Sequence, residues 1–327
     1  MGTVSAGYVD ISVVNRFVAL LKSGKLAHAY LLIGPLHSGK SETALRIAAM
    51  AVCPHCLETA GEEAESSCSA AVRIRSGNHP DVRVVELGEG QVIGIDQIKD
   101  AVAQMQLRPF EAARKVCVIR EVERLSAEAG NALLKTLEEP TLHSLFLLTT
   151  AVPERNLGTI RSRCHAVHFP SWPKEKLASR LKNDYAINDD AVRFLTLFSE
   201  GCWGRAKALQ ESRLFERKNE ILDRFLGDRD AESFIKTVLP DKDKTKEVLD
   251  VLLSFFRDVL LVKSGAPAEG LMHADRSPEI ADLARRYSLA QISGIIGQIV
   301  ETEQMLGDNL NVKIPAYILK EKIWARS

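Results

Sequence analysis

The sequence feature that constrains this chain most is a loop between an apolar run and a helical pattern. Residues 34–41 are Gly-Pro-Leu-His-Ser-Gly-Lys-Ser and match the phosphate-binding pattern G-x-x-x-x-G-K-[ST]. The apolar run 29–33 predicts a buried strand before this loop, and the apolar spacing over 42–50 predicts a helix after it. In that context the loop N–H groups and the start of the helix can bind a phosphate.

Four residues of this loop are candidate ligands for ATP and Mg²⁺. Gly34 and Gly39 let the backbone curl around a phosphate. Lys40 can reach the β- and γ-phosphates, and the hydroxyl of Ser41 can ligate Mg²⁺. The alternative is a glycine-rich turn without a nucleotide. We favour nucleotide binding because strand, loop and helix occur in the required order.

Composition excludes several classes of protein. The 327 residues contain 43 Lys and Arg and 43 Asp and Glu, so there is no global basic field for nucleic acid. The first residues lack a signal-peptide pattern, and no apolar run approaches the roughly 20 residues of a membrane span. We therefore expect a cytoplasmic protein whose DNA contacts, where they occur, are local or made through partners.

The order of predicted elements indicates an α/β fold followed by an all-helical part. Further strands are predicted at 82–86, 115–119, 145–150 and 166–169, and helices at 8–27, 93–106 and 126–138. This alternation predicts a doubly wound parallel sheet with its ligand at the carboxyl ends of the strands. No strand pattern follows Pro173, and residues 263–277 have a loop composition.

The end of the predicted strand 115–119 bears on ATP hydrolysis. An active ATPase carries Asp-Glu there, with the Asp supporting Mg²⁺ and the Glu polarising water. This chain has Arg120, which cannot ligate a metal, followed by Glu121. Glu121 is the candidate catalytic acid (Walker B), with a solvated or ion-paired Glu as the alternative. We expect bound ATP to be hydrolysed slowly or not at all, and we hypothesise that Arg120 pairs with a phosphate.

Several further motifs resemble the clamp-loader branch of the AAA+ ATPases. They are His28-Ala-Tyr-Leu-Leu, Gly77-Asn-His-Pro-Asp, Asn131-Ala-Leu-Leu-Lys-Thr-Leu-Glu-Glu-Pro and Ser162-Arg-Cys. Within this branch the delta-prime subunits of bacterial DNA polymerase III are more similar than the gamma/tau motor subunits. Gly204 stands where gamma/tau subunits have an arginine, although the adjacent Arg205 leaves a shifted sensor open. The likeness is dense over 26–165 and mostly architectural over 170–327.

The resemblance implies an AAA+ P-loop domain over 1–170, a helical lid over 171–212 and a helical collar over 213–327. It implies a hetero-pentameric ring with gamma/tau and delta subunits, part of the polymerase holoenzyme, which loads the sliding clamp onto primed DNA during replication. Arg163 would be a trans arginine finger for ATP in a neighbouring subunit, and from spacing alone it would be a surface arginine. Thr149 or Thr150 would sense the γ-phosphate, or be a plain strand-end threonine. The isolated chain would have weak or no ATPase activity.

Residues 53–71 lie where this family carries a four-cysteine zinc module. Cys53, Cys56 and Cys68 are candidate Zn²⁺ ligands, but Ala71 stands at the remaining family position. The fourth ligand would be His55, Glu65 or His79. The alternative is a degenerate module that binds no metal.

Two rival functions stay open from the sequence. The first is a self-sufficient gamma/tau-type ATPase motor, which the intact loop favours and which Arg120 and Gly204 oppose. The second is a scaffold that never binds nucleotide, which Lys40 and Ser41 oppose.

Overall fold

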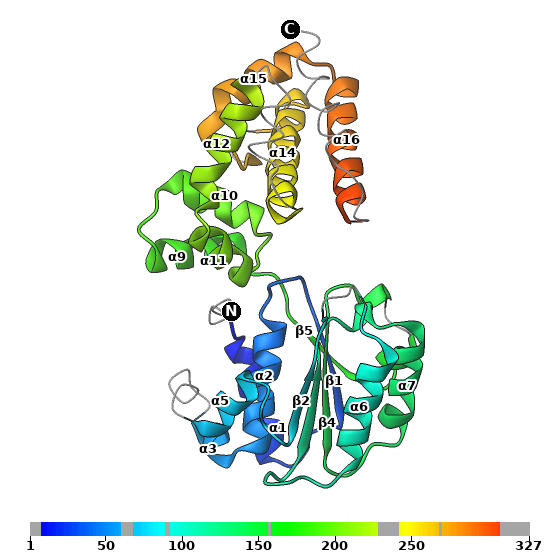
Figure 1. The fold of residues 1–327 in the computed structure, drawn as a ribbon. Coiled ribbons are helices and arrows are strands. Elements are labelled where there is room, and N and C mark those ends of the chain that lie inside the picture. Colours follow the sequence, from blue (N-terminus) through cyan, green and yellow to red (C-terminus); the bar gives the residue numbers. More distant parts are fainter. Residues whose placement is uncertain are drawn as a thin grey trace. The chain divides into compact units, whose positions relative to one another are not determined.

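All described strands lie before Pro173, and the described elements after it are helices, as the sequence predicted. One unit comprises Met1–Trp172 with Cys202–Arg205, and the other comprises Pro173–Gly201 with Ala206–Ser327 (Figure 1). The computed structural model describes residues 8–59, 68–88, 92–155, 158–227, 242–267 and 270–307. The predicted division into P-loop domain, lid and collar is finer than these two units and stays a prediction.

A parallel sheet forms the centre of the N-terminal unit. Its strands are β1 (Ala29–Ile33), β2 (Val82–Val85), β3 (Lys115–Ile119), β4 (Ser144–Thr150) and β5 (His165–His168). They pair in the order β2-β3-β4-β1-β5, with every pairing parallel. The inner strands are almost wholly buried, which explains their continuous apolar sequences. All carboxyl ends therefore lie at one edge of the sheet and all amino ends at the other.

Helices cover both faces of this sheet (Figure 1). Leu32, Val118 and Leu147 point into the core beneath one group of helices, α1 (Ile11–Lys22) and α2 (Lys40–Val52). Neighbouring strand residues such as Leu31 and Leu148 point to the opposite face, where α6 (Ile95–Gln106) and α7 (Ala127–Glu138) lie. This is the predicted α/β AAA+-like fold.

Local chemistry sets where these helices begin and end. The hydroxyl of Ser126 accepts the N–H of Ala129 (3.1 Å), which confirms the predicted start of α7. Helix α1 is shorter than the predicted 8–27. The Asp10 carboxylate caps its first turn, and Gly24 follows its end with a φ of +66°.

Among the described residues of the segment 53–80, two short helices occur that were not predicted from the sequence. They are α3 (Pro54–Glu58) and α5 (Ser69–Arg75). Helix α5 buries Ala70, Ala71 and Ile74 against the core that includes α2. The helix has only seven residues, which is too short for a clear apolar period in the sequence. The other short helices of this unit are η1 (Val122–Arg124), η2 (Pro153–Arg155) and α8 (Gly158–Arg161).

The described part of the C-terminal unit consists of helices joined by loops and contains no strand. Its helices are α9 (Lys174–Asp184), α10 (Asp189–Phe198), α11 (Trp203–Glu211, whose first residues belong to the N-terminal unit), α12 (Leu214–Gly227), α14 (Lys242–Lys263), η4 (Ala274–Arg276), α15 (Ser277–Arg286) and α16 (Leu289–Gly307). Phe255 and Phe256 of α14 are fully buried in its core.

Buried polar contacts hold the predicted loop after α14. The N–H of His273 donates to the carboxylate of Asp258 (2.8 Å), and Lys218 of α12 pairs with Asp275 (2.7 Å). Lys263 still belongs to α14, and η4 occupies Ala274–Arg276, so the described residues are more regular than the predicted loop. Breaking such a buried pair is costly because it leaves a charge without a partner.

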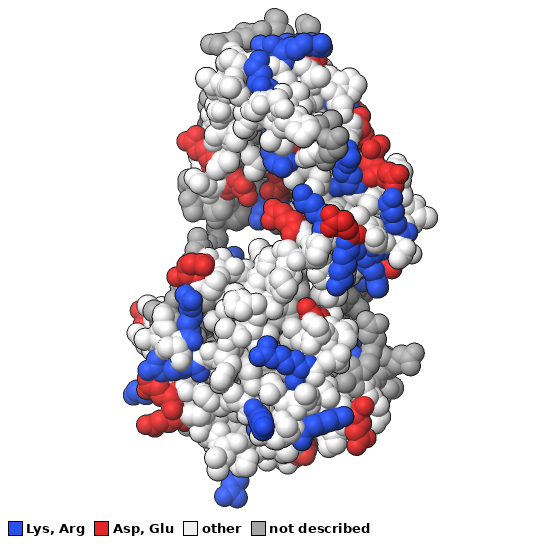
Figure 2. All heavy atoms as spheres, turned by 180° about the vertical axis from the view of Figure 1, so that it is seen from behind, with Lys and Arg blue, Asp and Glu red and all other residues white. Residues whose placement is uncertain are grey.

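The surface carries charges of both signs. On the face of the C-terminal unit that Figure 2 shows, Lys and Arg lie among Asp and Glu, as equal numbers of acidic and basic residues would suggest. None of the described helices is long and apolar enough to cross a membrane.

Candidate phosphate site and cysteine cluster

The loop 34–39 connects β1 to α2, and close backbone contacts require glycine at both of its ends. A Cβ atom on Gly34 would lie 2.6 Å from the carbonyl oxygen of Phe169, and one on Gly39 would meet the carbonyl oxygen of Tyr8. Gly39 also has a φ of +88°, in the left-handed region that favours glycine. Packing alone therefore explains these glycines, and the choice between phosphate loop and plain turn depends on other residues.

Lys40 is buried, and the loop itself binds its ammonium group. Its Nζ donates to the carbonyl oxygens of Gly34 (2.7 Å) and Pro35 (2.6 Å). Burial lowers the pKa of Lys40, and the carboxylate of Glu123 opposes this shift. Ser41 follows in the first turn of α2 and is partly buried. A phosphate that binds Lys40 would replace its two carbonyl contacts.

The predicted acid and the predicted sensor meet where β3 and β4 end. The N–H of Glu121 donates to Oγ1 of Thr149 (3.1 Å), and Thr149 is buried. Glu121 has a φ of +51°, and its carboxylate lies 3.4 Å from Nε of Arg124. The carboxylate is therefore ion-paired within the chain, which was the alternative interpretation of this residue. Its role toward water stays a prediction.

Arg120 points to a neighbouring strand. Its Nη1 lies 2.6 Å from a carboxylate oxygen of Glu86, which directly follows β2. Arg120 thus has an anionic partner inside the subunit, and a phosphate would have to displace Glu86 to pair with it. The structure offers a local reason for the arginine, independent of nucleotide.

Glu123 was not predicted from the sequence, although it lies two residues after Glu121 in η1. Among the carboxylates that act on Lys40, Glu123 has the larger effect and Glu121 the smaller. One carboxylate oxygen accepts the N–H of Ala151 (2.9 Å), and the other is buried without a hydrogen-bond partner among the described residues. The only signal in the sequence was that Glu123 lies two residues after Glu121. The turn of η1 brings the Glu123 carboxylate close enough to act on Lys40.

Arg163 lies between α8 and β5. Its Nη1 donates to the carbonyl oxygen of Thr159 (2.9 Å) and to the hydroxyl of Ser162 (3.2 Å). Its Nη2 forms an ion pair with Glu138, the last residue of α7. Arg163 is therefore a partly exposed arginine with ordered contacts, in contrast to a freely solvated surface side chain.

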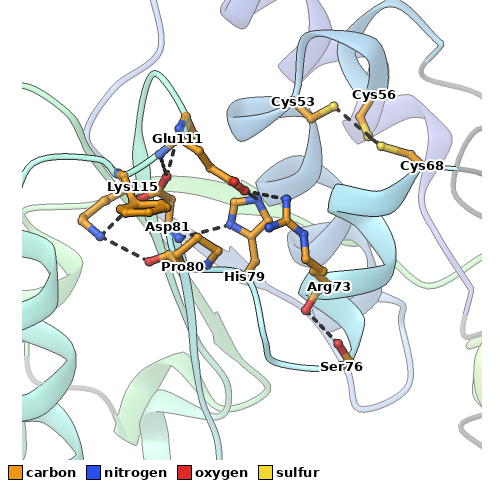
Figure 3. A network of polar contacts seen from close by, with 12 residues as sticks. Cys53, Cys56, Cys68, Arg73, Ser76, His79, Pro80, Asp81, Glu111 and Lys115 are labelled. Carbon is orange, nitrogen blue, oxygen red and sulfur yellow. Dashed lines mark hydrogen bonds and ion pairs between the residues drawn. The ribbon is translucent and has the colours of Figure 1, made fainter.

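The three predicted zinc ligands come together. Cys53 ends α2, Cys56 lies in α3, and Cys68 caps α5. Their sulfur atoms all lie within 4.8 Å of one another, with Cys56 and Cys68 3.1 Å apart (Figure 3). Burial raises the pKa of Cys56, whereas the N–H of Ala71 helps to lower the pKa of Cys68 to about 6 against the effect of burial. These three thiols could bind Zn²⁺, which prefers thiolate ligands.

The fourth ligand does not come from the candidates that the structure describes. The Nδ1 atom of His79 accepts the N–H of Asp81 (3.1 Å), and its Nε2 faces Glu111 (3.3 Å; Figure 3). His55 is exposed and does not join the sulfur cluster. Glu65 lies outside the described residues. Three thiols thus fit a zinc site, and a fourth ligand would come from elsewhere.

Comparison with known proteins identifies the family of this chain. Residues 10–173 match the family described as "DNA polymerase III, delta subunit", and residues 212–314 match its C-terminal family. The chain is 30% identical to DNA polymerase III subunit delta' of Bacillus subtilis (strain 168), over 90% of this chain and 89% of that protein. The chain belongs to the delta-prime family of DNA polymerase III clamp-loader subunits.

Other relatives place this delta-prime family member within the clamp-loader group. It is 26% identical to DNA polymerase III subunit delta' of Escherichia coli (strain K12), over 89% of this chain and 86% of that protein. It is 29% identical to DNA polymerase III subunit tau of Bacillus subtilis (strain 168), over 78% of this chain. The match covers 49% of tau, so the chain spans about half the length of that relative.

Gly204, which the family resemblance singled out, has a steric explanation in the structure. A Cβ atom on Gly204 would lie 2.5 Å from the carbonyl oxygen of His37 in the phosphate loop. An arginine at this position would therefore force the loop to move. The close contact of Gly204 with the loop therefore leaves no room for a side chain at this position.

Proposed function

We propose that this delta-prime subunit supports ATP-dependent loading of the sliding clamp onto primed DNA in the cytoplasm. It would do so in a five-subunit ring with gamma/tau and delta subunits. In this ring Arg163 enters the nucleotide site of a neighbouring gamma/tau subunit as a trans arginine finger. A guanidinium in that position stabilises the charge on the phosphoryl group during transfer.

The observation that carries this proposal is the position of Arg163 relative to the sheet. The phosphate loop follows the carboxyl end of β1, whereas Arg163 comes two residues before the amino end of β5. The two strands pair in parallel from Tyr30 to Ile33, so roughly 10 Å of strand separates the two levels. This placement favours a nucleotide held by another subunit over one held by the chain's own loop.

The subunit's own loop would bind ATP with Mg²⁺ and hydrolyse it poorly. Gly34, Gly39, Lys40 and Ser41 supply the phosphate and metal ligands, and Thr149 the sensor. Arg120 occupies the position of the metal-supporting acid and is paired with Glu86. Without that acid, a bound nucleotide would serve mainly to stabilise the fold.

A self-sufficient gamma/tau-type motor is the alternative, favoured by the intact loop and by the similarity to tau. Both functions predict that ATP with Mg²⁺ raises the melting temperature of the isolated chain, because a ligand that binds only the folded state stabilises it. The Lys40→Ala variant should lose this shift. No shift in the wild-type chain would favour a scaffold that binds no nucleotide.

The experiment that tests the proposal is steady-state ATPase activity of the reconstituted loader with clamp and primed DNA. We expect Arg163→Ala to lower the rate at least about tenfold, since arginine fingers contribute far more than this at a single site. Arg161→Ala, an exposed arginine two residues away, is the matched control. Robust ATPase of the isolated chain that is indifferent to Arg163 would favour the self-sufficient motor.

A further inference from the structure

Arg163 is folded back onto its own subunit. One side of the guanidinium donates to Thr159 and Ser162, and another pairs with Glu138. The Nε atom is buried and makes no hydrogen bond within the described part of the chain. A trans finger, by contrast, must direct its N–H groups at a phosphate of the neighbouring subunit. The observed contacts therefore belong to a retracted position of the side chain.

Glu138 is well placed to retain the arginine. It is the last residue of α7, where the helix dipole disfavours a carboxylate and a nearby cation compensates. The Glu138 and Arg163 side chains are 46% and 30% exposed. Water screens an ion pair of this exposure, so the pair adds little to the stability of the fold. It can open and close without unfolding the helices that carry it.

We propose that Glu138 is a positioning residue that holds Arg163 back until clamp and primed DNA engage the loader. The proposal rests on the trans-finger function proposed above. When the ring brings a γ-phosphate close, Arg163 can leave the carboxylate of Glu138 and pair with the phosphate, which carries more negative charge. Before engagement, the carboxylate of Glu138 competes for the guanidinium and keeps hydrolysis by the neighbouring subunit low.

The test compares loaders that contain wild-type chain or the Glu138→Gln variant, which keeps the size of the side chain and removes its charge. We expect ATPase activity without clamp and DNA to rise about two- to fivefold, the effect of losing an exposed ion pair. The rate with clamp and primed DNA should change less. Gel filtration checks that both loaders assemble. Glu139→Gln, an exposed carboxylate one residue further on, is the matched control and should leave both rates unchanged.

A double variant separates retention from a general loosening of the fold. In the Arg163→Ala background, Glu138→Gln should no longer raise the unstimulated rate, whereas loosening would act in both backgrounds. An unchanged unstimulated rate in Glu138→Gln, with Arg163→Ala still strongly impaired, would overturn retention and leave the finger intact. A lower stimulated rate alone would also overturn it, because Glu138 would then align the arginine. Full activity of Arg163→Ala would refute the finger itself.

Discussion

Among single residues, Asp81 illustrates how a buried charge can hold a loop in place. Its carboxylate accepts the N–H groups of Phe110 (2.7 Å), Glu111 (2.9 Å) and Ala112 (2.9 Å), and it pairs with Lys115 (3.2 Å). Burial would raise the pKa of Asp81, but these bonds outweigh burial and lower it. The charged form of Asp81 is therefore the one that the folded chain stabilises.

We predict that Asp81→Asn lowers the free energy of unfolding by about 3 kcal/mol at neutral pH, because Lys115 loses its buried partner. The folded-state pKa of Asp81 lies below its ordinary value of 3.8. The stabilisation is therefore complete above that value and is lost as the pH falls through the folded-state pKa. Urea unfolding at several pH values measures this, with the exposed Asp100→Asn as control. Equal losses in both variants, or a loss independent of pH, would contradict the account.

The candidate site was predictable residue by residue only where spacing carries the signal. The positions of Lys40 and Ser41 follow from a motif, and the clustering of Cys53, Cys56 and Cys68 from the family resemblance, which the structure supports. The partners of Arg120 and Arg163 were not predictable. They lie on separate strands and helices, 34 and 25 residues away along the chain.

Among the structural elements, α3 and α5 each bring a cysteine thiol close to the end of α2. Helix α3 carries Cys56, and the residue that caps α5 is Cys68. Ala71 lies in the first turn of α5, where the family resemblance implies a fourth cysteine. The helices were missed because five and seven residues are too few to show a helical apolar period, whereas the cysteine spacing that joins them was recognised.

We predict that Zn²⁺ raises the melting temperature of chelator-treated protein, because three thiolates bind the ion only in the folded state. At a hundredfold excess over the dissociation constant the stabilisation would be about 3 kcal/mol. Cys68→Ser should lose the shift, Ala71→Cys should enlarge it, and Cys164→Ser, outside the cluster, should keep it. A zinc content near zero in protein purified without chelator would refute zinc binding by this cluster.

For the whole molecule, hydrophobic periodicity predicted the sheet, the helical C-terminal part and the change at Pro173. This succeeded because parallel strands buried on both faces have an unmistakable apolar pattern. The bounds of α1 were not predicted correctly, because the Asp10 carboxylate and Gly24 determine them. The short helices α3 and α5 were not predicted at all. The similarity to delta-prime subunits settles the family, whereas the roles of the individual site residues stay predictions.

The central claim is that this subunit acts on nucleotide held by its neighbour more than on its own. It is tested most directly by clamp-stimulated ATP hydrolysis in loaders that carry either Lys40→Ala or Arg163→Ala in this chain. We expect Lys40→Ala to leave most of the activity and Arg163→Ala to remove most of it. Loss with Lys40→Ala and little change with Arg163→Ala would contradict the account and show that the chain's own loop drives hydrolysis.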